Sequence, residues 1–180
     1  MTATDRLMIR PFTAEDFPAW YAIFSDPDLI RTFGGGLYRD EKEARDKFFA
    51  GSVGDPRRNA IVLKETGEVV GVITCCEPNP WVAAREDLKP FRGRSLSYAL
   101  LPAFRGRGYA VEAARAVTEA CFAEGADYVN AGFFAGNLSS EAVQKKLGFS
   151  YYGAHTYARN GDVVQVTENI LWNPASAPDA

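Results

Sequence analysis

The sequence predicts an α+β fold, with a single mixed, mostly antiparallel central sheet of about seven strands and helices on both faces. Three observations support it. Short runs rich in β-branched and aromatic residues recur, some joined by tight turns. Segments with helical spacing of apolar residues lie between them. The chain has 180 residues, 47% of them hydrophobic, and no repeat, linker or break in composition. We therefore expect a single domain over residues 1–180, with its core at about 6–172.

The first strand and helix are predicted from alternation followed by a capping pattern. Arg6–Phe12 alternates side chains as a strand does. Thr13 and Asp16 then resemble a capping box, which begins a helix. Its apolar stripe consists of Phe17, Trp20, Tyr21 and Phe24.

Helical segments continue to about residue 50. Asp26-Pro27 ends the first helix and begins a short second one through Phe33. The run Gly34-Gly35-Gly36 predicts a flexible loop. Asp40 with Glu43 indicates another helix N-terminus, and that helix runs to about Ala50.

The middle of the chain predicts three strands and one long connection. Asn59–Glu65 and Glu68–Glu77 are β-rich and meet at Thr66-Gly67, which indicates a hairpin. Pro78–Gly93 is polar, holds three prolines and is longer than an ordinary connection, so we expect an irregular lid or specificity loop. Arg94–Leu101 is the next strand.

The following segment is expected to form helix, strand and helix. The first helix runs from about Gly106 to Glu124 and is ended by Gly125. Tyr128–Phe134 is the strand. The second helix is capped by Asn137 or Ser139 and runs through Leu147 to Gly148.

Two closing strands complete the predicted sheet. They are Phe149–Tyr157 and Val163–Trp172, around a turn at Asn160-Gly161. The tail Asn173–Ala180 is rich in proline and alanine and is expected to be loose.

Composition excludes several classes of protein. The net charge is -3 and the pI about 5.3, which argues against nucleic acid as a partner. No apolar run approaches the roughly 20 residues of a membrane helix. The polar start Met1-Thr2-Ala3-Thr4-Asp5 lacks the apolar core of a signal peptide, so we expect a cytoplasmic protein that does not bind membranes.

Cysteine and histidine content argues against a metal site. Cys75 and Cys76 are neighbours, so in a strand they point to opposite faces. Cys121 falls on a helix face with Ala114 and Val117, as a packing residue would. The one histidine is His155. We therefore expect neither a bound metal nor a Ser-His-Asp triad.

The segment Pro102–Ala110 carries the strongest functional signal. Gly106 and Gly108 lie in a basic turn between a strand and a helix, where their N–H groups can approach an anion closely. The helix that follows adds unpaired N–H donors, and Arg105 and Arg107 add charge. These residues favour a phosphorylated ligand. The alternatives are an ordinary basic turn before a helix and an Arg-Gly nucleic-acid segment, although such segments are longer.

Two motifs resemble those of the GNAT superfamily of acyl-CoA N-acetyltransferases. Arg105-Gly106-Arg107-Gly108-Tyr109-Ala110 is similar to its pyrophosphate loop. Asn137-Leu138-Ser139-Ser140, followed by Val143, Lys146, Leu147, Gly148 and Phe149, is similar to its second signature. The opening Asp5–Pro11 and Glu112 are similar to the RimJ/RimL-type branch, which acts on N-terminal amines of ribosomal proteins and on small amines. The resemblance spans about Arg6–Trp172.

This resemblance implies acetyl-CoA as the co-substrate. The pyrophosphate is expected on the N–H groups of Arg105, Gly106, Arg107, Gly108, Tyr109 and Ala110. The pantetheine arm is expected to pair, like an added strand, with the strand end around Leu100. Asn137 is expected to hydrogen-bond that arm, with a simple helix cap as the alternative reading.

The same resemblance implies direct attack of a free amine on the thioester. An N–H near Tyr98–Leu100 is expected to donate to the developing oxyanion. Ser140 matches the residue proposed to protonate the leaving sulfur, and its alternative is an ordinary first-turn position. Many relatives use a tyrosine at the position of Gln144, which here cannot serve.

The proton acceptor stays open at this stage. Glu77, Asp87, His155 and Glu168 are all conceivable, as is a water relay. Glu168 interrupts an apolar strand face, which is unusual. The sequence departs from the branch pattern at Ser95 and Ser97, which stand where an acidic residue and a glycine are common. These departures concern the amine end of the site.

We therefore expect an acetyl-CoA-dependent N-acetyltransferase that acts on a protein N-terminus or a small-molecule amine. The resemblance is also compatible with a homodimer, since dimers are common in the family. An acetyl-CoA-binding or regulatory module without turnover is the alternative, because no base is obvious. An interaction domain in which the loop is merely a turn is a third hypothesis.

Overall fold

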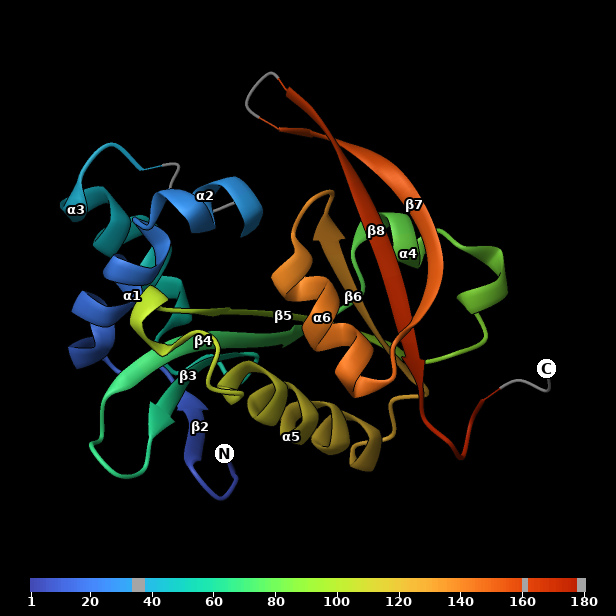
Figure 1. Ribbon diagram of the computed structural model, residues 1–180, viewed down its shortest axis with the longest axis horizontal. Coiled ribbons are helices and arrows are strands. Elements are labelled where there is room, and N and C mark those ends of the chain that lie inside the picture. Colours follow the sequence, from blue (N-terminus) through green and yellow to red (C-terminus); the bar gives the residue numbers. More distant parts are fainter. Residues whose placement is uncertain (34–37, 160–161, 178–180) are drawn as a thin grey trace. The chain divides into compact units, whose positions relative to one another are not determined.

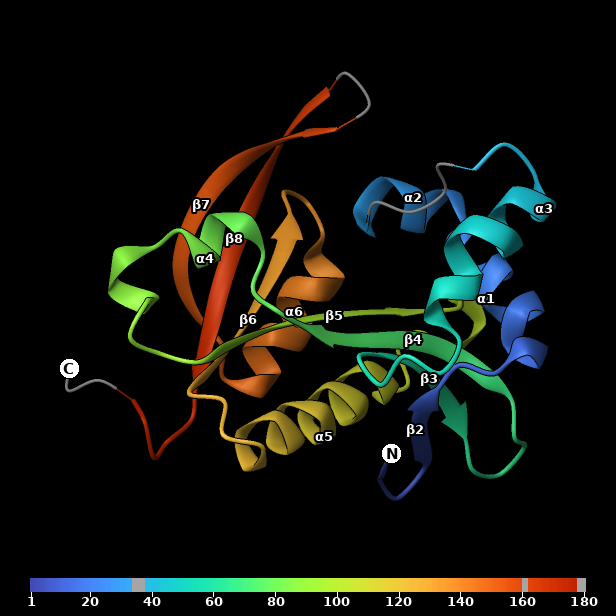
Figure 2. The same ribbon diagram turned by 180° about the vertical axis from the view of Figure 1, so that it is seen from behind.

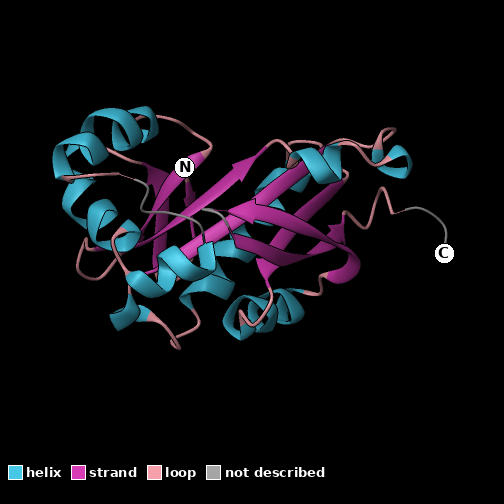
Figure 3. Ribbon diagram, turned by 90° about the horizontal axis from the view of Figure 1, so that it is seen from above, coloured by secondary structure: helices cyan, strands magenta, loops and turns pink. Residues whose placement is uncertain are grey.

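The computed structural model describes residues 1–33, 38–159 and 162–177. The loop predicted at Gly34-Gly35-Gly36 and the turn predicted at Asn160-Gly161 lie outside these ranges. The strands follow the sheet order β1-β2-β3-β4-β5-β6-β8-β7 (Figure 1). The chain divides into two compact units, residues 1–74 with 98–116 (unit 1) and residues 75–97 with 117–180 (unit 2). Both units contain strands and helices, which Figure 1 labels and Figure 3 colours by type.

Unit 1 is built on antiparallel strands and a group of short helices. Its strands are β1 (Thr2–Ala3), β2 (Leu7–Pro11), β3 (Arg58–Leu63) and most of β4 (Val69–Cys76). Its helices before β3 are η1 (Ala14–Asp16), α1 (Phe17–Phe24), α2 (Pro27–Phe33), α3 (Glu41–Glu43), η2 (Ala44–Phe49) and η3 (Ala50–Ser52). In Figures 1 and 2, α1, α2 and α3 gather beside one another.

An aromatic cluster holds these helices together. Phe17 is 1% exposed and packs edge-on to Phe49 at 5.3 Å between ring centroids. Trp20 lies 5.6 Å from the same ring. The cluster also contacts Ala60 and Val62 of β3, which are buried. The stripe that the sequence predicts on the first helix is thus the one that the core uses, since burial of large rings dominates packing energy.

Unit 2 contains the remaining strands and helices. Its strands are the first part of β5 (Gly93–Leu100), β6 (Tyr128–Phe134), β7 (Ser150–Arg159) and β8 (Asp162–Trp172). Its helices are α4 (Pro80–Ala83), η4 (Glu86–Leu88), the second half of α5 (Tyr109–Ala123) and α6 (Leu138–Leu147). The short η5 (Pro102–Phe104) precedes α5 in unit 1. β5 pairs with β6 in parallel, and β8 pairs antiparallel with β6 and with β7.

The predicted α+β class with one mixed sheet is confirmed, and so are several local signals. Thr13 and Asp16 form the capping box. Asp40 caps its helix by accepting from the Glu43 N–H at 2.8 Å. Gly148 ends α6 in the left-handed region, at φ 86°.

Other predictions are corrected. Over the residues that the structure describes, the sheet has eight strands rather than about seven, because Thr2–Ala3 pairs with β2 over two residues, too few for a periodic pattern. Pro78–Gly93 is not irregular throughout, since it holds α4 and η4. The tail is not loose at its start, because Asn173 donates its backbone N–H to Asp127 O at 2.8 Å.

The structure also defines where the two later helices, α5 and α6, begin. The helix predicted from about Gly106 begins at Tyr109, because Gly106 and Gly108 adopt positive φ. Asn137, not Ser139, caps α6, and its side chain accepts from the Ser140 N–H at 3.1 Å.

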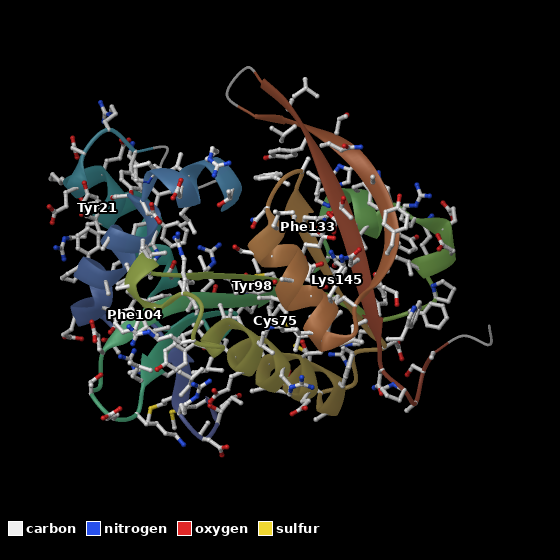
Figure 4. The ribbon with its side chains drawn as sticks, in the orientation of Figure 1. Tyr21, Cys75, Tyr98, Phe104, Phe133 and Lys145 are labelled. Atoms are coloured by element: carbon white, nitrogen blue, oxygen red, sulfur yellow. The ribbon has the colours of Figure 1, made fainter. Side chains whose placement is uncertain are left out.

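Cys75 and Cys121 contact each other inside unit 2. Cys121 is buried, as predicted for a packing residue. A hydrogen bond to Cys121 and burial raise the pKa of the Cys75 thiol (Cys75 is labelled in Figure 4). Within the described ranges, none of the helices has both the length and the apolar character needed to cross a membrane.

We expect Gly93→Ala to lower the free energy of unfolding by roughly 1–3 kcal/mol, the usual effect of overpacking. A Cβ at this position would overlap the ring of Tyr128, a residue that is 2% exposed. Urea denaturation measures the change. Gly51→Ala is the matched control, because a Cβ there meets nothing within 4 Å. Equal unfolding midpoints for the two variants would contradict the packing argument.

Candidate active site

The predicted phosphate loop joins η5 to α5 within unit 1. Gly106 and Gly108 have φ of 77° and 84°, in the left-handed region that favours glycine. A Cβ built on Gly106 would meet nothing within 4 Å, so its backbone is open to a ligand. The loop leads directly into the 15-residue helix α5, whose first N–H groups have no partner within the helix. This arrangement is suited to an anion such as a pyrophosphate.

Glu112 in the first turn of α5 fixes this helix start to the N-terminal segment. Its carboxylate accepts from Thr4 Oγ1 at 2.5 Å and from the backbone N–H of Arg6 at 3.0 Å. The Arg6 guanidinium adds an ion pair at 2.6 Å. Burial raises the pKa of Glu112, but the hydrogen bonds from Thr4 and Arg6 outweigh it and hold the pKa below 4.5.

Arg6 also touches the loop itself. Its Nη1 donates to the carbonyl of Arg107 at 3.1 Å, and its guanidinium lies 4.6 Å from the centroid of the Tyr109 ring. One side chain therefore contacts the residues on either side of Gly108. Sequence reasoning associated Glu112 and the opening strand with one family branch, and the structure shows why they occur together.

The two loop arginines have different surroundings. Arg105 donates through Nε to the Leu100 carbonyl at 3.1 Å and forms an ion pair with Asp26 at 2.5 Å. Its charge is therefore compensated within the chain. Arg107 is exposed, and its guanidinium lies 5.5 Å from the ring centroid of Phe104, a residue that is labelled in Figure 4. Of these two arginines, Arg107 is the better placed to attract an anion.

Leu100 lies at the end of β5. It is 8% exposed, and its carbonyl accepts from Arg105. The next residue, Leu101, donates its N–H to Val70 O at 2.9 Å. The backbone at this strand end is thus held in place on both sides of the Leu100–Leu101 peptide.

A polar chain links Ser140 to β8 within unit 2. Asn169 Nδ2 donates to Gln144 Oε1 at 2.8 Å, and Gln144 Nε2 donates to Ser140 Oγ at 3.3 Å. Gln144 is 1% exposed, whereas its neighbour Lys145 faces outward and pairs with Glu141 at 2.6 Å (Figure 4). Since Ser140 Oγ accepts from Gln144, its own O–H is polarised for donation.

The four candidate bases have different environments. The Glu77 side chain is 75% exposed and pairs with Arg94 at 3.0 Å. Asp87 is exposed and accepts from the Tyr152 hydroxyl at 2.8 Å. His155 and Glu168 lie together, with His155 Nε2 3.2 Å from Glu168 Oε1.

Sequence reasoning missed the residues that support these groups. Asn79 and Asn130 both donate to the Glu168 carboxylate. A polar Asn130 inside the apolar strand Tyr128–Phe134 was the available signal. Asn169 and the orienting role of Gln144 were also missed, because such contacts join distant segments of the chain.

We expect Glu112→Gln to lower the free energy of unfolding by about 1 kcal/mol at neutral pH, as charge-assisted contacts with a half-exposed Arg6 allow. The pKa of Glu112 is lowered in the folded protein, so its contribution is complete above pH 4.5 and disappears as the pH falls through the lowered pKa. The wild type and the variant should therefore converge in acid. Urea unfolding at a series of pH values measures this, with the exposed Glu119→Gln as control. A difference that does not depend on pH would contradict it.

Comparisons with known proteins identify the family of the chain. Residues 6–150 match the family model described as an acetyltransferase (GNAT) domain. No curated protein sequence gives a significant match.

Solved structures similar to the chain include a GNAT-family acetyltransferase from Bacillus anthracis, with a TM-score of 0.80, 20% identity, and coverage of 95% of this chain and 97% of that one. A spermidine N-acetyltransferase from Vibrio cholerae, in complex with CoA and spermine, has a TM-score of 0.75 and 13% identity. The match covers 94% of this chain and 96% of that one. The ribosomal-protein α-N-acetyltransferase RimL, in complex with coenzyme A, has a TM-score of 0.75 and 17% identity. The match covers 94% of this chain and 95% of that one.

At these identities the structural likenesses show the fold alone. The family model, however, covers most of the chain and includes the glycine loop, Asn137 and Ser140. The protein belongs to the GNAT family of acetyltransferases and is an N-acetyltransferase.

Proposed function

We propose that the protein transfers the acetyl group of acetyl-CoA to a primary amine, and that it belongs to the RimJ/RimL-type branch. The observation that carries this proposal is the glycine loop, with two left-handed residues at the start of α5. The contact of Arg6 with Glu112 and Arg107 supports the assignment to this branch. Solved relatives of similar fold act on spermidine and on a ribosomal protein N-terminus, so both kinds of acceptor are reasonable.

The residues of the loop suit a pyrophosphate. The N–H groups of Gly106, Arg107, Gly108, Tyr109 and Ala110 would hold it, together with the positive end of α5. Arg105 would act mainly by holding the loop, since its guanidinium is bound to Asp26 and to the Leu100 carbonyl. The backbone N–H of Arg105 is also engaged, because it donates to Pro102 O at 3.2 Å.

Asn137 would serve two purposes. Its Oδ1 caps α6 by accepting from the Ser140 N–H. Its Nδ2 would donate to an amide carbonyl of the pantetheine arm, so the cap and the ligand contact are compatible. The strand end around Leu100 would pair with the same arm.

Ser140 would give a proton to the sulfur as the thiolate leaves. Gln144 donates to Ser140 Oγ, and Asn169 fixes Gln144, so the Ser140 O–H is directed to a different acceptor. Gln144 therefore does not replace the tyrosine that many relatives carry there. It would orient the serine that does the chemistry.

The loop is tested by a matched pair of substitutions. Gly106 and Gly54 have φ of 77° and 73°, and a Cβ on either would meet nothing within 4 Å. Alanine at either position should cost about 1–2 kcal/mol of stability through the same backbone strain. Only Gly106→Ala should also weaken acetyl-CoA binding, by at least roughly tenfold, because its N–H would turn away from the phosphate.

Calorimetric titration with acetyl-CoA, and with ATP and NAD as controls, measures this difference. The same wild-type preparation is then assayed for thiol release with spermidine and with a peptide that has a free N-terminal serine. Equal acetyl-CoA affinity for both alanine variants would remove the loop from the site. Binding without thiol release would refute catalysis on these amines.

Ser140→Ala is expected to lower kcat roughly 10²-fold while the Kd for acetyl-CoA stays unchanged, because a proton donor is lost and not a binding contact. Ser139→Ala is the control, since Ser139 is exposed on the same helical turn. Steady-state kinetics of thiol release measures both. Unchanged turnover in Ser140→Ala would exclude it as the proton donor.

A further inference from the structure

A buried carboxylate stands at the centre of a polar cluster in unit 2. Glu168 on β8 is 2% exposed. Its Oε1 accepts from Asn79 Nδ2 at 2.8 Å, and its Oε2 accepts from Asn130 Nδ2 at 3.0 Å. His155 Nε2 lies 3.2 Å from Oε1. Hydrogen bonds to both oxygens fix the orientation of the carboxylate.

The polar cluster around Glu168 and the hydrogen-bond chain from Asn169 to Ser140 lie on opposite faces of β8. Glu168 and Asn169 are consecutive in a strand, so their side chains point to opposite sides. Asn169 bonds to Gln144 of α6, whereas Glu168 bonds to Asn79, the cap of α4. Gly132, paired with Glu168, leaves it room, since a Cβ there would lie 2.8 Å from Oε1. A proton donor and a carboxylate are thus supported on the two faces of one strand.

His155 is held in a defined position beside this carboxylate. Its ring stacks on Trp81 at 4.7 Å between centroids and 14° between planes. Trp81 is in turn packed against Gly153, where a Cβ would lie 2.7 Å from its ring. The His155 side chain is 16% exposed, so it remains within reach of solvent.

Both imidazole nitrogens face oxygen atoms. Nε2 lies 3.2 Å from Glu168 Oε1, and Nδ1 lies 3.3 Å from the carbonyl of Thr156. A neutral ring carries one N–H and satisfies one of these contacts, whereas a protonated ring donates to both. The surroundings therefore accommodate an added proton without rearrangement.

Other charged groups near the ring are engaged elsewhere. Arg85 lies 4.9 Å from the centroid of Trp81, on the residue that stacks on His155. Asp87 accepts from the hydroxyl of Tyr152, whose ring packs edge-on against Trp81. Glu168 is the charged group that contacts the imidazole directly among the described residues.

The cluster lies where the parallel pairing of β5 with β6 ends. The pairs are Gly93↔Tyr128, Arg94↔Val129 and Ser95↔Asn130. Asn130, in the last of them, is the residue that donates to Glu168. Its Oδ1 is buried without a hydrogen-bond partner among the described residues, and so provides an acceptor for an N–H or O–H brought by an incoming group. β6, β7, β8 and α4 surround this point (Figures 1 and 2).

We propose that His155 takes the proton of the attacking amine, directly or through one water, and that Glu168 is the positioning residue that orients it. This inference rests on the proposed acetyl transfer. The ammonium group gives one proton to the neutral imidazole, and the freed nitrogen lone pair forms the C–N bond. The C–S bond breaks with its electron pair on sulfur. Sulfur receives the second N–H proton by way of Ser140, and the imidazolium releases its proton to solvent.

The test is the pH dependence of acetyl transfer in the wild type, His155→Gln and Glu168→Gln, at saturating acetyl-CoA with spermidine and the serine peptide. His155→Gln should lower kcat roughly 10²-fold, leave the Kd for acetyl-CoA unchanged, and abolish the part of the profile due to imidazole. Because His155 is the one histidine of the chain, that part has a single source. Glu168→Gln should also lower kcat, and the double variant should lose less than the two separate losses combined.

Two further variants keep the test decisive. Added imidazole should restore part of the activity of His155→Ala, which a merely structural defect would not allow. Glu77→Gln is the control and should keep the wild-type profile, since Glu77 is exposed and paired with Arg94. If His155→Gln binds acetyl-CoA and keeps the wild-type kcat and profile, the inference is overturned while the proposed function stands. A wild type that binds acetyl-CoA but acetylates neither amine refutes catalysis on these amines and overturns the inference with it.

Discussion

The candidate phosphate site depends on the hydrogen bonds and the ion pair that the carboxylate of Glu112 forms. It receives donors from Thr4 and from the backbone and side chain of Arg6, and Arg6 then reaches the carbonyl of Arg107. A loop with two left-handed glycines has much conformational freedom, which folding must remove. These contacts remove it by joining the start of α5 to the N-terminal segment. Preorganised N–H groups bind an anion better than mobile ones because less entropy is lost.

Buried polar side chains orient the residues that we propose to transfer protons, Ser140 and His155. Glu168, Asn130, Gln144 and Asn169 are all nearly inaccessible. Burial of such groups is unfavourable unless hydrogen bonds replace those lost with water, so their positions are strongly constrained. On one face of β8 the constraint orients Gln144 toward Ser140, and on the other it orients Glu168 toward His155. A proposed proton donor and a proposed proton acceptor thus acquire fixed geometry from neighbouring side chains that bind neither substrate in the proposal.

Local signals in the sequence were sufficient for much of the fold. Capping at Thr13 and Asp40, and the helix stop at Gly148, depend on contacts within a few residues, and the structure contains them. Two failures have a common reason. The two-residue β1 is a strand because β2 lies beside it, and α4 begins where Asn79 caps it and also reaches Glu168. Neither has a periodicity of its own to detect.

The sequence by itself determined the α+β class, the glycine loop before a helix and the motif around Ser140, because these features are written in residue types at short spacing. Only the tertiary structure decided which polar residues act together. Arg105 with Asp26, Glu112 with Arg6, and His155 with Glu168 and Asn79 are separated by 13 to 106 positions in the chain. Such pairs have no local pattern, since their energy arises only when folding brings them together and excludes water from around them.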